Sequence, residues 1–131
     1  MKKVTSSDKI HISQSKIPGA DRGVFANLNI KRGEIIEICP IIEIPNQEIS
    51  NIEKSILVNY VYFFGKNKDR MLLALGFGSI YNHSYTPNAE YKIKPSKRIV
   101  QFVATQNIKK GEEITVNYSQ GNSKRPRLWF E

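Results

Sequence analysis

The chain has 131 residues and a formal net charge of +8, and hydrophobic residues make up 40% of it. A chain of this length is expected to form one domain that buries a core without disulfides. Its single cysteine, Cys39, excludes an intramolecular disulfide, and no Cys/His cluster has the spacing of a zinc site. Because no segment approaches the roughly 20 apolar residues of a membrane-spanning helix, we expect an intracellular protein without a membrane partner. It would be cytoplasmic or nuclear/nucleoid, with secretion into a host cell left open.

Short β-strands separated by turn signals account for most of the chain. In chain order the predicted strands are 9–16, 24–26, 34–38, 41–44, 71–75, 91–93, 98–104 and 114–116. The third and fourth are predicted to be separate, because Pro40 cannot donate a hydrogen bond to a sheet. The polar stretch 45–54 favours one or two helical turns. Residues 94–97 are predicted to connect the two strands of a hairpin.

Two segments of the chain repeat each other. Residues 25–35 read Phe-Ala-Asn-Leu-Asn-Ile-Lys-Arg-Gly-Glu-Ile, and residues 103–113 read Val-Ala-Thr-Gln-Asn-Ile-Lys-Lys-Gly-Glu-Glu. Two copies are too few for a solenoid. They predict instead a pair of similar strand-turn-strand units, each with an isoleucine beneath a basic turn, in a compact β fold.

Two motifs point to a functional site. Residues 81–88, Tyr-Asn-His-Ser-Tyr-Thr-Pro-Asn, concentrate hydrogen-bonding side chains and turn formers in a single loop. Residues 111–118, Gly-Glu-Glu-Ile-Thr-Val-Asn-Tyr, place the phenol of Tyr118 at the end of a β-prone run. Taken alone, a histidine beside an asparagine more often stabilises a loop than binds a ligand.

These residues resemble the SET-domain protein lysine methyltransferases. Residues 82–88 look like the family's Asn-His-Ser-x-x-Pro-Asn motif, and 111–118 like its Gly-Glu-Glu-(Leu/Ile)-Thr-x-(Asp/Asn)-Tyr motif. Residues 18–26 are similar to its cofactor loop, Gly-x-Gly-(Val/Leu)-Phe-Ala. Asp21 stands in place of the first glycine of that loop, and Asp tolerates a positive φ better than most residues. All three motifs occur in the family's order between about residue 10 and residue 131.

The resemblance implies a mostly β fold, the SET domain or β-clip, built from several short sheets with few short helices and a C-terminal pseudoknot. Residues 1–131 would be a single SET domain. Residues 1–9 would be a flexible basic start, and residues 119–131 a tail that closes the site.

The resemblance also implies an activity: transfer of a methyl group from S-adenosyl-L-methionine to the side-chain amine of a protein lysine. Tyr118 is then the catalytic tyrosine. The side chain of Asn82 is expected at the amino-acid end of the cofactor, and the backbone of His83 at the adenine. The other expected cofactor residues are Asp21, Arg22, Gly23, Val24, Phe25 and Trp129. No metal is expected.

A channel for the substrate lysine is expected to be lined by Tyr60, Tyr81, Val116 and Phe130. Val116 occupies the position that governs methylation state in many family members, where Phe or Tyr is common, so we predict more than one methyl group. The expected partner is a protein that presents a lysine, such as a histone-like tail or another basic protein. An acidic groove formed by Glu43, Glu48 or Glu53 would offset the positive charge of the chain.

The excess of lysine and arginine also favours acidic partners. A solvated basic surface is the simpler interpretation, since no RNA-binding aromatic motif or helix-turn-helix pattern is present. We therefore expect at most a weak association with nucleic acid or nucleoprotein.

Two other classes of function remain open. The chain could be a catalytically silent SET-fold module that docks basic or nucleoprotein partners, although Asn82, His83 and Tyr118 are all intact. It could also be a β-clip domain for a different small ligand, which would leave the loop and the tyrosine unexplained together.

Overall fold

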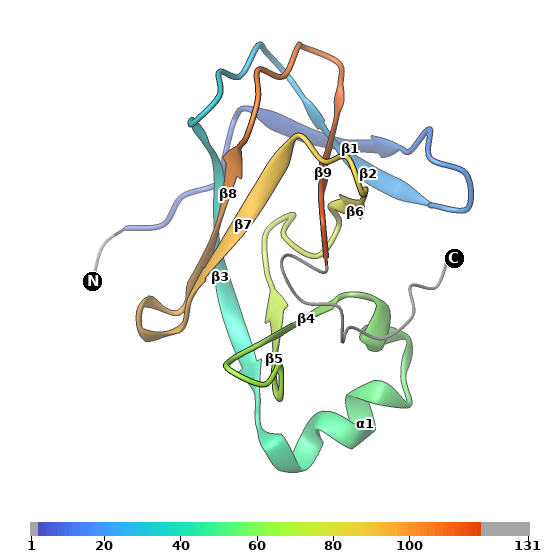
Figure 1. Cartoon of the computed structure of the whole chain (residues 1–131), viewed down its shortest axis with the longest axis vertical. Helices are drawn as coiled ribbons and strands as arrows, with labels where there is room; N and C mark the ends of the chain where they lie inside the picture. Colours follow the sequence, from blue (N-terminus) through green and yellow to red (C-terminus); the bar gives the residue numbers. More distant parts are fainter. Residues whose placement is uncertain (1–2, 119–131) are drawn as a thin grey trace.

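The computed structural model describes residues 3–118, which form two β-sheets and a few short helical segments (Figure 1). The four-stranded sheet has the order β1-β2-β9-β6, with β1 Ile10–Gln14, β2 Arg22–Ala26, β9 Glu113–Val116 and β6 Asn82–His83. The five-stranded sheet has the order β4-β5-β3-β8-β7, with β4 Val61–Phe64, β5 Arg70–Ala74, β3 Ile35–Ile44, β8 Ile99–Ala104 and β7 Ala89–Lys94. The predicted mostly β architecture is confirmed.

The predicted break at Pro40 is wrong, because β3 runs through this residue as one strand. β3 pairs with β8 up to Pro40 and with β5 from Ile41 onward. The carbonyl of Pro40 accepts a hydrogen bond from the backbone N of Leu75 at 2.9 Å, on the β5 side. The missing N–H therefore falls at the end of the β3–β5 ladder, where a proline is tolerated.

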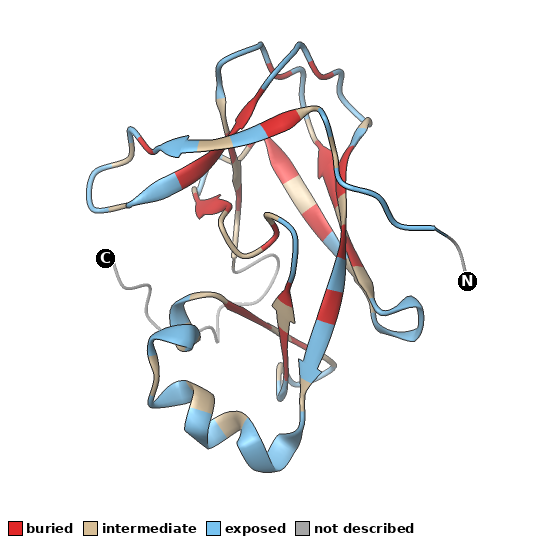
Figure 2. Ribbon diagram, turned by 180° about the vertical axis from the view of Figure 1, so that it is seen from behind, coloured by how far each residue is buried: buried red, intermediate tan, exposed pale blue. Residues whose placement is uncertain are grey.

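The connection between β3 and β4 is helical and lies on the surface. It consists of η1 Asn46–Glu48, α1 Ile49–Glu53 and η2 Ile56–Asn59, and none of these elements contains a buried residue. Figure 2 shows the segment as mostly exposed ribbon at the end of the molecule away from the four-stranded sheet. The helical turns predicted within 45–54 are confirmed, and so is the hairpin of β7 and β8, which is closed by η3 Pro95–Lys97.

Both sheets contribute side chains to a common core. Its fully buried members include Val24 and Ile114 from the first sheet, and Cys39, Leu72 and Phe102 from the second. Cys39 is a free, buried thiol. Close packing of the two sheets fixes the relative positions of the loops that leave them.

The two repeated segments lie side by side and contact each other reciprocally. Ile30 and Ile108 form an antiparallel bridge in which each backbone N donates to the other's carbonyl at 2.8 Å. The predicted pair of similar units is therefore present. Their turns also exchange side-chain bonds: the backbone N of Arg32 donates to Asn107 Oδ1, and that of Lys110 to Asn29 Oδ1, each at 2.9 Å.

The start of the described chain is attached to the region around β3. Ser7 Oγ donates to the carbonyl of Ile36 at 2.7 Å, and Lys9 Nζ lies 3.1 Å from Glu34 Oε2. Within residues 3–118, no helix has the length and apolar character needed to span a membrane.

Candidate active site

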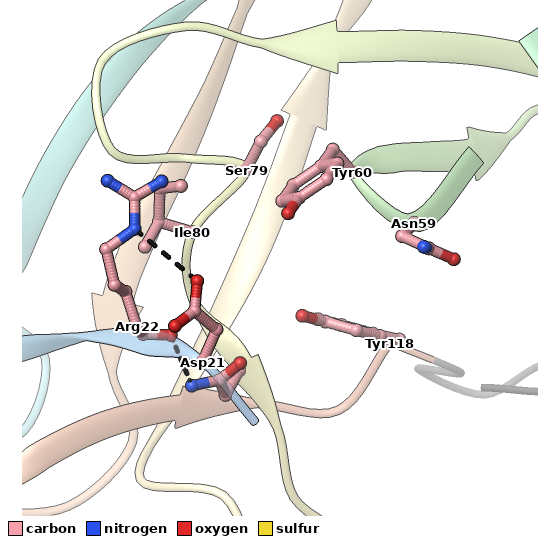
Figure 3. A pocket seen from close by; sticks show the side chains of 8 residues that line it. Asp21, Arg22, Asn59, Tyr60, Ser79, Ile80 and Tyr118 are labelled. Carbon is pink, nitrogen blue, oxygen red and sulfur yellow. Dashed lines mark hydrogen bonds and ion pairs between the residues drawn. The ribbon is translucent and has the colours of Figure 1, made fainter. Parts of the chain in front are cut away.

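A pocket lies where four separate segments of the chain meet (Figure 3). Its volume is about 220 Å³, and it is lined by Asp21, Arg22, Asn59, Tyr60, Ser79, Ile80, Asn82 and Tyr118. In Figure 3 the hydroxyl groups of Tyr60 and Tyr118 point into the same space, opposite Asp21 and Ile80. The pocket thus combines aromatic walls with a few polar groups, the usual composition of a small-molecule site.

The C-terminal strand brings Tyr118 to this pocket. β9 runs between β2 and β6 and pairs in parallel with β6, so that Asn82 lies opposite Thr115 and His83 opposite Val116. The backbone N of Tyr118 donates to Nδ1 of His83 at 3.0 Å. Because Nδ1 is an acceptor, a neutral His83 ring carries its proton on Nε2. His83 thereby holds the end of β9 beside Asn82.

The side-chain amide of Asn82 has a fixed orientation. Its nitrogen donates to the carbonyl of Arg22 at 2.9 Å and to Glu113 Oε2 at 2.8 Å. Both partners are acceptors only, so the nitrogen must face them. Asn82 is 5% exposed and lines the pocket. Its Oδ1 consequently remains as the group that can accept a hydrogen bond from a ligand.

The carboxylate of Glu113 holds the side chain of Asn82 in this orientation. Besides the amide of Asn82, its carboxylate accepts from Ser15 Oγ at 2.8 and 3.0 Å. A Cβ atom at Gly23 would lie 2.3 Å from Glu113 Oε2 and 3.0 Å from Asn82 Nδ2. Only glycine therefore allows β2 to approach the carboxylate this closely.

Asn88, at the end of the polar loop, ties that loop to β9. Its Nδ2 donates to the carbonyl of Glu113, and its Oδ1 accepts from the backbone N of Thr115, both at 2.9 Å. Through these two hydrogen bonds Asn88 takes the place of a neighbouring strand beside β9 and holds the polar loop against it.

The hydroxyl of Tyr118 also has a defined direction. It donates to the backbone carbonyl of Tyr81, and the carbonyl of Tyr118 accepts from the hydroxyl of Tyr91 at 2.8 Å. Since its one proton is directed at Tyr81, the Tyr118 oxygen offers lone pairs to a ligand. An oxygen held in this way can accept from an amine or orient a polarised methyl group.

The model of the SET domain matches residues 21–119. A histone-lysine N-methyltransferase of Schizosaccharomyces pombe, specific for H3 lysine-37, is 32% identical over 111 residues, which are 84% of this chain and 70% of that protein. The chain belongs to the SET-domain family. Its mostly β SET fold is thereby shown.

Solved SET-domain structures agree with this assignment. A Plasmodium falciparum protein described as a histone methyltransferase is 38% identical, with a TM-score of 0.65, and the match covers 84% of this chain and 96% of that one. The Chaetomium thermophilum Polycomb Repressive Complex 2 bound to S-adenosylmethionine gives a TM-score of 0.73 at 21% identity, covering 92% of this chain and 16% of that one. The second likeness shows the fold alone.

Five of the residues predicted from the sequence line the pocket described above: Asp21, Arg22, Tyr60, Asn82 and Tyr118. His83 is 3% exposed and contacts the pocket wall through Tyr118. Gly23 lies directly behind Asn82 and Glu113. Asp21 has no positive φ, since among the described non-glycine residues only Lys68 and Arg98 do. The glycine it replaces is therefore not needed for backbone freedom.

Other predicted residues do not line this pocket. Val24, Phe25, Tyr81 and Val116 are all buried in the core, at 0 to 6% exposure. The ring of Tyr81 stacks on Phe102 at a centroid distance of 4.0 Å. Trp129 and Phe130 lie outside the described residues. The cofactor and channel roles assigned to these six remain predictions.

Sequence reasoning missed several residues that build the SET site. Asn59, Ser79 and Ile80 line the pocket, and Glu113 and Ser15 support Asn82. Glu113 was visible as the second glutamate of the Gly-Glu-Glu motif. The lining residues carry no comparable signal, because they meet the site only through the tertiary fold.

The acidic groove expected from Glu43, Glu48 and Glu53 is not part of this pocket, which has Asp21 as its one acidic lining residue among the described residues. Glu43 instead makes a bidentate contact with Arg70, at 2.7 and 2.8 Å. The guanidinium of Arg70 holds the pKa of Glu43 below its ordinary value. Within residues 3–118, no group of three His, Cys, Asp or Glu side chains is placed to hold a metal ion.

Proposed function

We propose that this SET-domain protein transfers methyl groups from S-adenosyl-L-methionine to the side-chain amine of a protein lysine. One observation carries the proposal: the oxygen of Asn82 and the hydroxyl oxygen of Tyr118 are both fixed as acceptors on the wall of one pocket. The family assignment and the histone-lysine methyltransferase named among its relatives support the same reaction.

The pocket fits the amino-acid end of this cofactor. The methionine part of S-adenosylmethionine carries an ammonium group, and Asn82 Oδ1 is an oriented acceptor for such a donor. Arg22 is 57% exposed at its side chain and lines the same pocket, where it can face a carboxylate. When bound, the cofactor supplies a methyl group activated by a positively charged sulfur.

The aromatic wall suits a lysine that must react as a neutral amine. A free lysine is protonated near neutral pH. Where the aromatic wall of Tyr60 and Tyr118 excludes water from the amine, it disfavours the ammonium form and lowers the pKa of that amine. The lone pairs of the Tyr118 oxygen then orient the amine. Most of the acceleration is expected from this positioning and from electrostatics, with little proton transfer by the tyrosine itself.

The substrate we propose is a basic protein or a histone-like tail. The fission yeast relative is named for a lysine of histone H3, and the neighbour from Plasmodium falciparum is described as a histone methyltransferase. These names support a nuclear or other intracellular location. The net charge of +8 supports a weak association with nucleoprotein, through which such a substrate would be delivered.

The proposed product carries more than one methyl group. Val116 is fully buried two residues before Tyr118. It lies behind the pocket wall and is smaller than the Phe or Tyr that the family resemblance places here in a restricted channel, so we infer that a partly methylated amine can turn in the site.

Titration calorimetry with S-adenosylmethionine, followed by turnover on lysine peptides, separates the proposal from its alternatives. Binding together with turnover is the expected result. Binding without turnover on any lysine protein would indicate a silent docking module, and no binding would indicate a different ligand. Labelled-methyl transfer to histones, ribosomal proteins and whole-cell lysate then identifies the substrate and, by mass spectrometry, the number of methyl groups.

A further inference from the structure

A buried carboxylate lies behind the pocket, outside the set of lining residues. Glu37 is on β3 and is 6% exposed. Within the described residues no lysine or arginine forms an ion pair with it. Burying a carboxylate without a cation is costly unless hydrogen bonds compensate. The hydrogen-bond donors that compensate for this burial therefore show what the carboxylate holds in place.

The two oxygens of Glu37 hold the loop between β5 and β6 at two points. Oε1 accepts from the hydroxyl of Tyr81 at 2.8 Å, and Oε2 accepts from the backbone N of Phe77 at 3.0 Å. The loop closes tightly on the carboxylate, since a Cβ at Gly76 would lie 2.6 Å from Oε2 and the φ of Gly76 is +61°. This loop carries two residues of the pocket wall, Ser79 and Ile80.

The contact with Tyr81 continues to the hydroxyl that acts on the substrate. The ring of Tyr81 is fully buried, and it is held at its face by Phe102 and at its hydroxyl by Glu37. A ring fixed at both places fixes its own backbone. The backbone carbonyl of Tyr81 in turn accepts the hydroxyl proton of Tyr118. One chain of contacts therefore runs from Glu37 through Tyr81 to Tyr118.

We propose that Glu37 is a positioning residue of the methyl transfer, which directs the Tyr118 hydroxyl through Tyr81 and holds the Ser79–Ile80 wall through Phe77. This inference rests on the proposed function. Burial, and then the charge of Glu37, raise the pKa of the Tyr81 phenol, which keeps it protonated as a donor. Tyr81 was predicted from the sequence to line the lysine channel. In this proposal it does not line the channel but orients the Tyr118 hydroxyl through its backbone carbonyl.

A double-mutant cycle with Tyr81→Phe and Tyr118→Phe tests the inference. Tyr81→Phe removes the bond to Glu37 and keeps the ring. We expect it to lower kcat about tenfold while the affinity for S-adenosylmethionine stays within about threefold, because the Tyr118 hydroxyl acts in the transition state. In the Tyr118→Phe background the same change should lower kcat less than about twofold, since no hydroxyl is left to direct. Losses that multiply in the double variant would show that Tyr81 has only a structural role.

Two further variants on β3 keep the test decisive if Tyr81→Phe fails to fold. Glu37→Gln keeps the size of the side chain but has one acceptor oxygen for two donors, so kcat should fall about tenfold and cofactor affinity several-fold. Glu43→Gln is the matched control on the same strand, and it should change both less than about twofold. Equal effects of the two would overturn the proposal.

The outcomes distinguish this inference from the function on which it rests. A wild-type protein that binds no S-adenosylmethionine and methylates no lysine contradicts both. If the wild type methylates lysine and the Glu37→Gln variant keeps the full wild-type kcat, only the positioning role is contradicted.

Discussion

At the scale of single residues, the site contains two hydrogen-bond acceptors whose orientation is fixed by neighbouring groups. The side-chain oxygen of Asn82 is left for the pocket, because its side-chain nitrogen donates to the carbonyl of Arg22 and to the carboxylate of Glu113. Tyr118 likewise offers its lone pairs because its proton is directed at Tyr81. A ligand that bound in this pocket would therefore meet groups that need no reorganisation.

We expect Asn82→Ala to weaken binding of S-adenosylmethionine by about 1 to 3 kcal/mol, because it removes the oriented acceptor and leaves the Glu113 carboxylate with one donor fewer. Titration calorimetry measures the change. Asn67→Ala, an exposed change in the turn between β4 and β5, is the control and should leave affinity intact. Equal affinity of the Asn82→Ala variant and the wild type would rule out the assigned contact.

Sequence alone predicted the residues of the site that carry motifs. Asn82, His83 and Tyr118 were identifiable because each belongs to a fixed string of residue types. Glu37 was not, because a glutamate in an apolar strand gives no sign of whether it faces solvent or the core. Its role follows from the direction in which β3 presents it and from the close approach of Gly76.

At the scale of elements, the internal repeat is a structural device. It joins the two sheets where the segments 25–35 and 103–113 exchange backbone and side-chain hydrogen bonds. The sequence showed the repeat, and an isoleucine beneath a basic turn was correctly predicted for each copy. The continuity of β3 through Pro40 was not predicted. Proline lacks a backbone N–H, but the sequence does not show that Pro40 lies where β3 stops pairing with β8 and begins to pair with β5.

The two copies of the repeat should contribute equally to stability. Asn29→Ala and Asn107→Ala each remove one side-chain acceptor from the backbone N–H of the other copy, and each should cost about 0.5 to 1.5 kcal/mol of unfolding free energy. Urea denaturation measures both, with Asn67→Ala as the control in a turn outside the repeat. A loss in one variant and none in the other would contradict the reciprocal arrangement.

The segment 119–131 lies outside the described residues, and we keep the proposal that it closes the site. Deleting residues 126–131, which include Trp129 and Phe130, should reduce activity far more than stability, because a large aromatic lost from a desolvated contact costs roughly 2 to 4 kcal/mol. Trp129 is the one tryptophan of the chain, so its fluorescence reports the closure. Full activity after truncation, or fluorescence indifferent to cofactor and peptide, would refute a closing tail.

At the scale of the whole molecule, burial changes the ionisation of two core groups, the Cys39 thiol and the Tyr81 phenol. Burial, followed by the charge of Glu37, raises the pKa of the Cys39 thiol far above its ordinary value of 9.0. The same causes raise the pKa of the Tyr81 phenol well above 10.0. Both groups therefore stay neutral in the folded protein under conditions where the unfolded chain ionises.

Stability should therefore fall as the pH rises above 9.0. In that range the unfolded thiol loses its proton and the folded one keeps it, so the unfolded state binds fewer protons and is favoured by increasing pH. The contribution of Cys39 is fully present below pH 9.0 and decreases by about 1 kcal/mol over the next unit. Urea denaturation of Cys39→Ala should show a weaker dependence on pH than the wild type. Parallel curves would contradict a thiol protected by burial.

Methyl transfer by the intact chain tests the central claim most directly. The wild type and the Tyr118→Phe variant are incubated with labelled S-adenosylmethionine and a lysine-bearing protein substrate, and incorporation into lysine is measured along with cofactor affinity. We predict transfer by the wild type, at least about tenfold slower transfer by Tyr118→Phe, and cofactor affinities that agree within a few fold, because the hydroxyl acts mainly in the transition state. Equal transfer rates for the two proteins would contradict the role of Tyr118, and binding without transfer to any lysine would contradict the proposed activity.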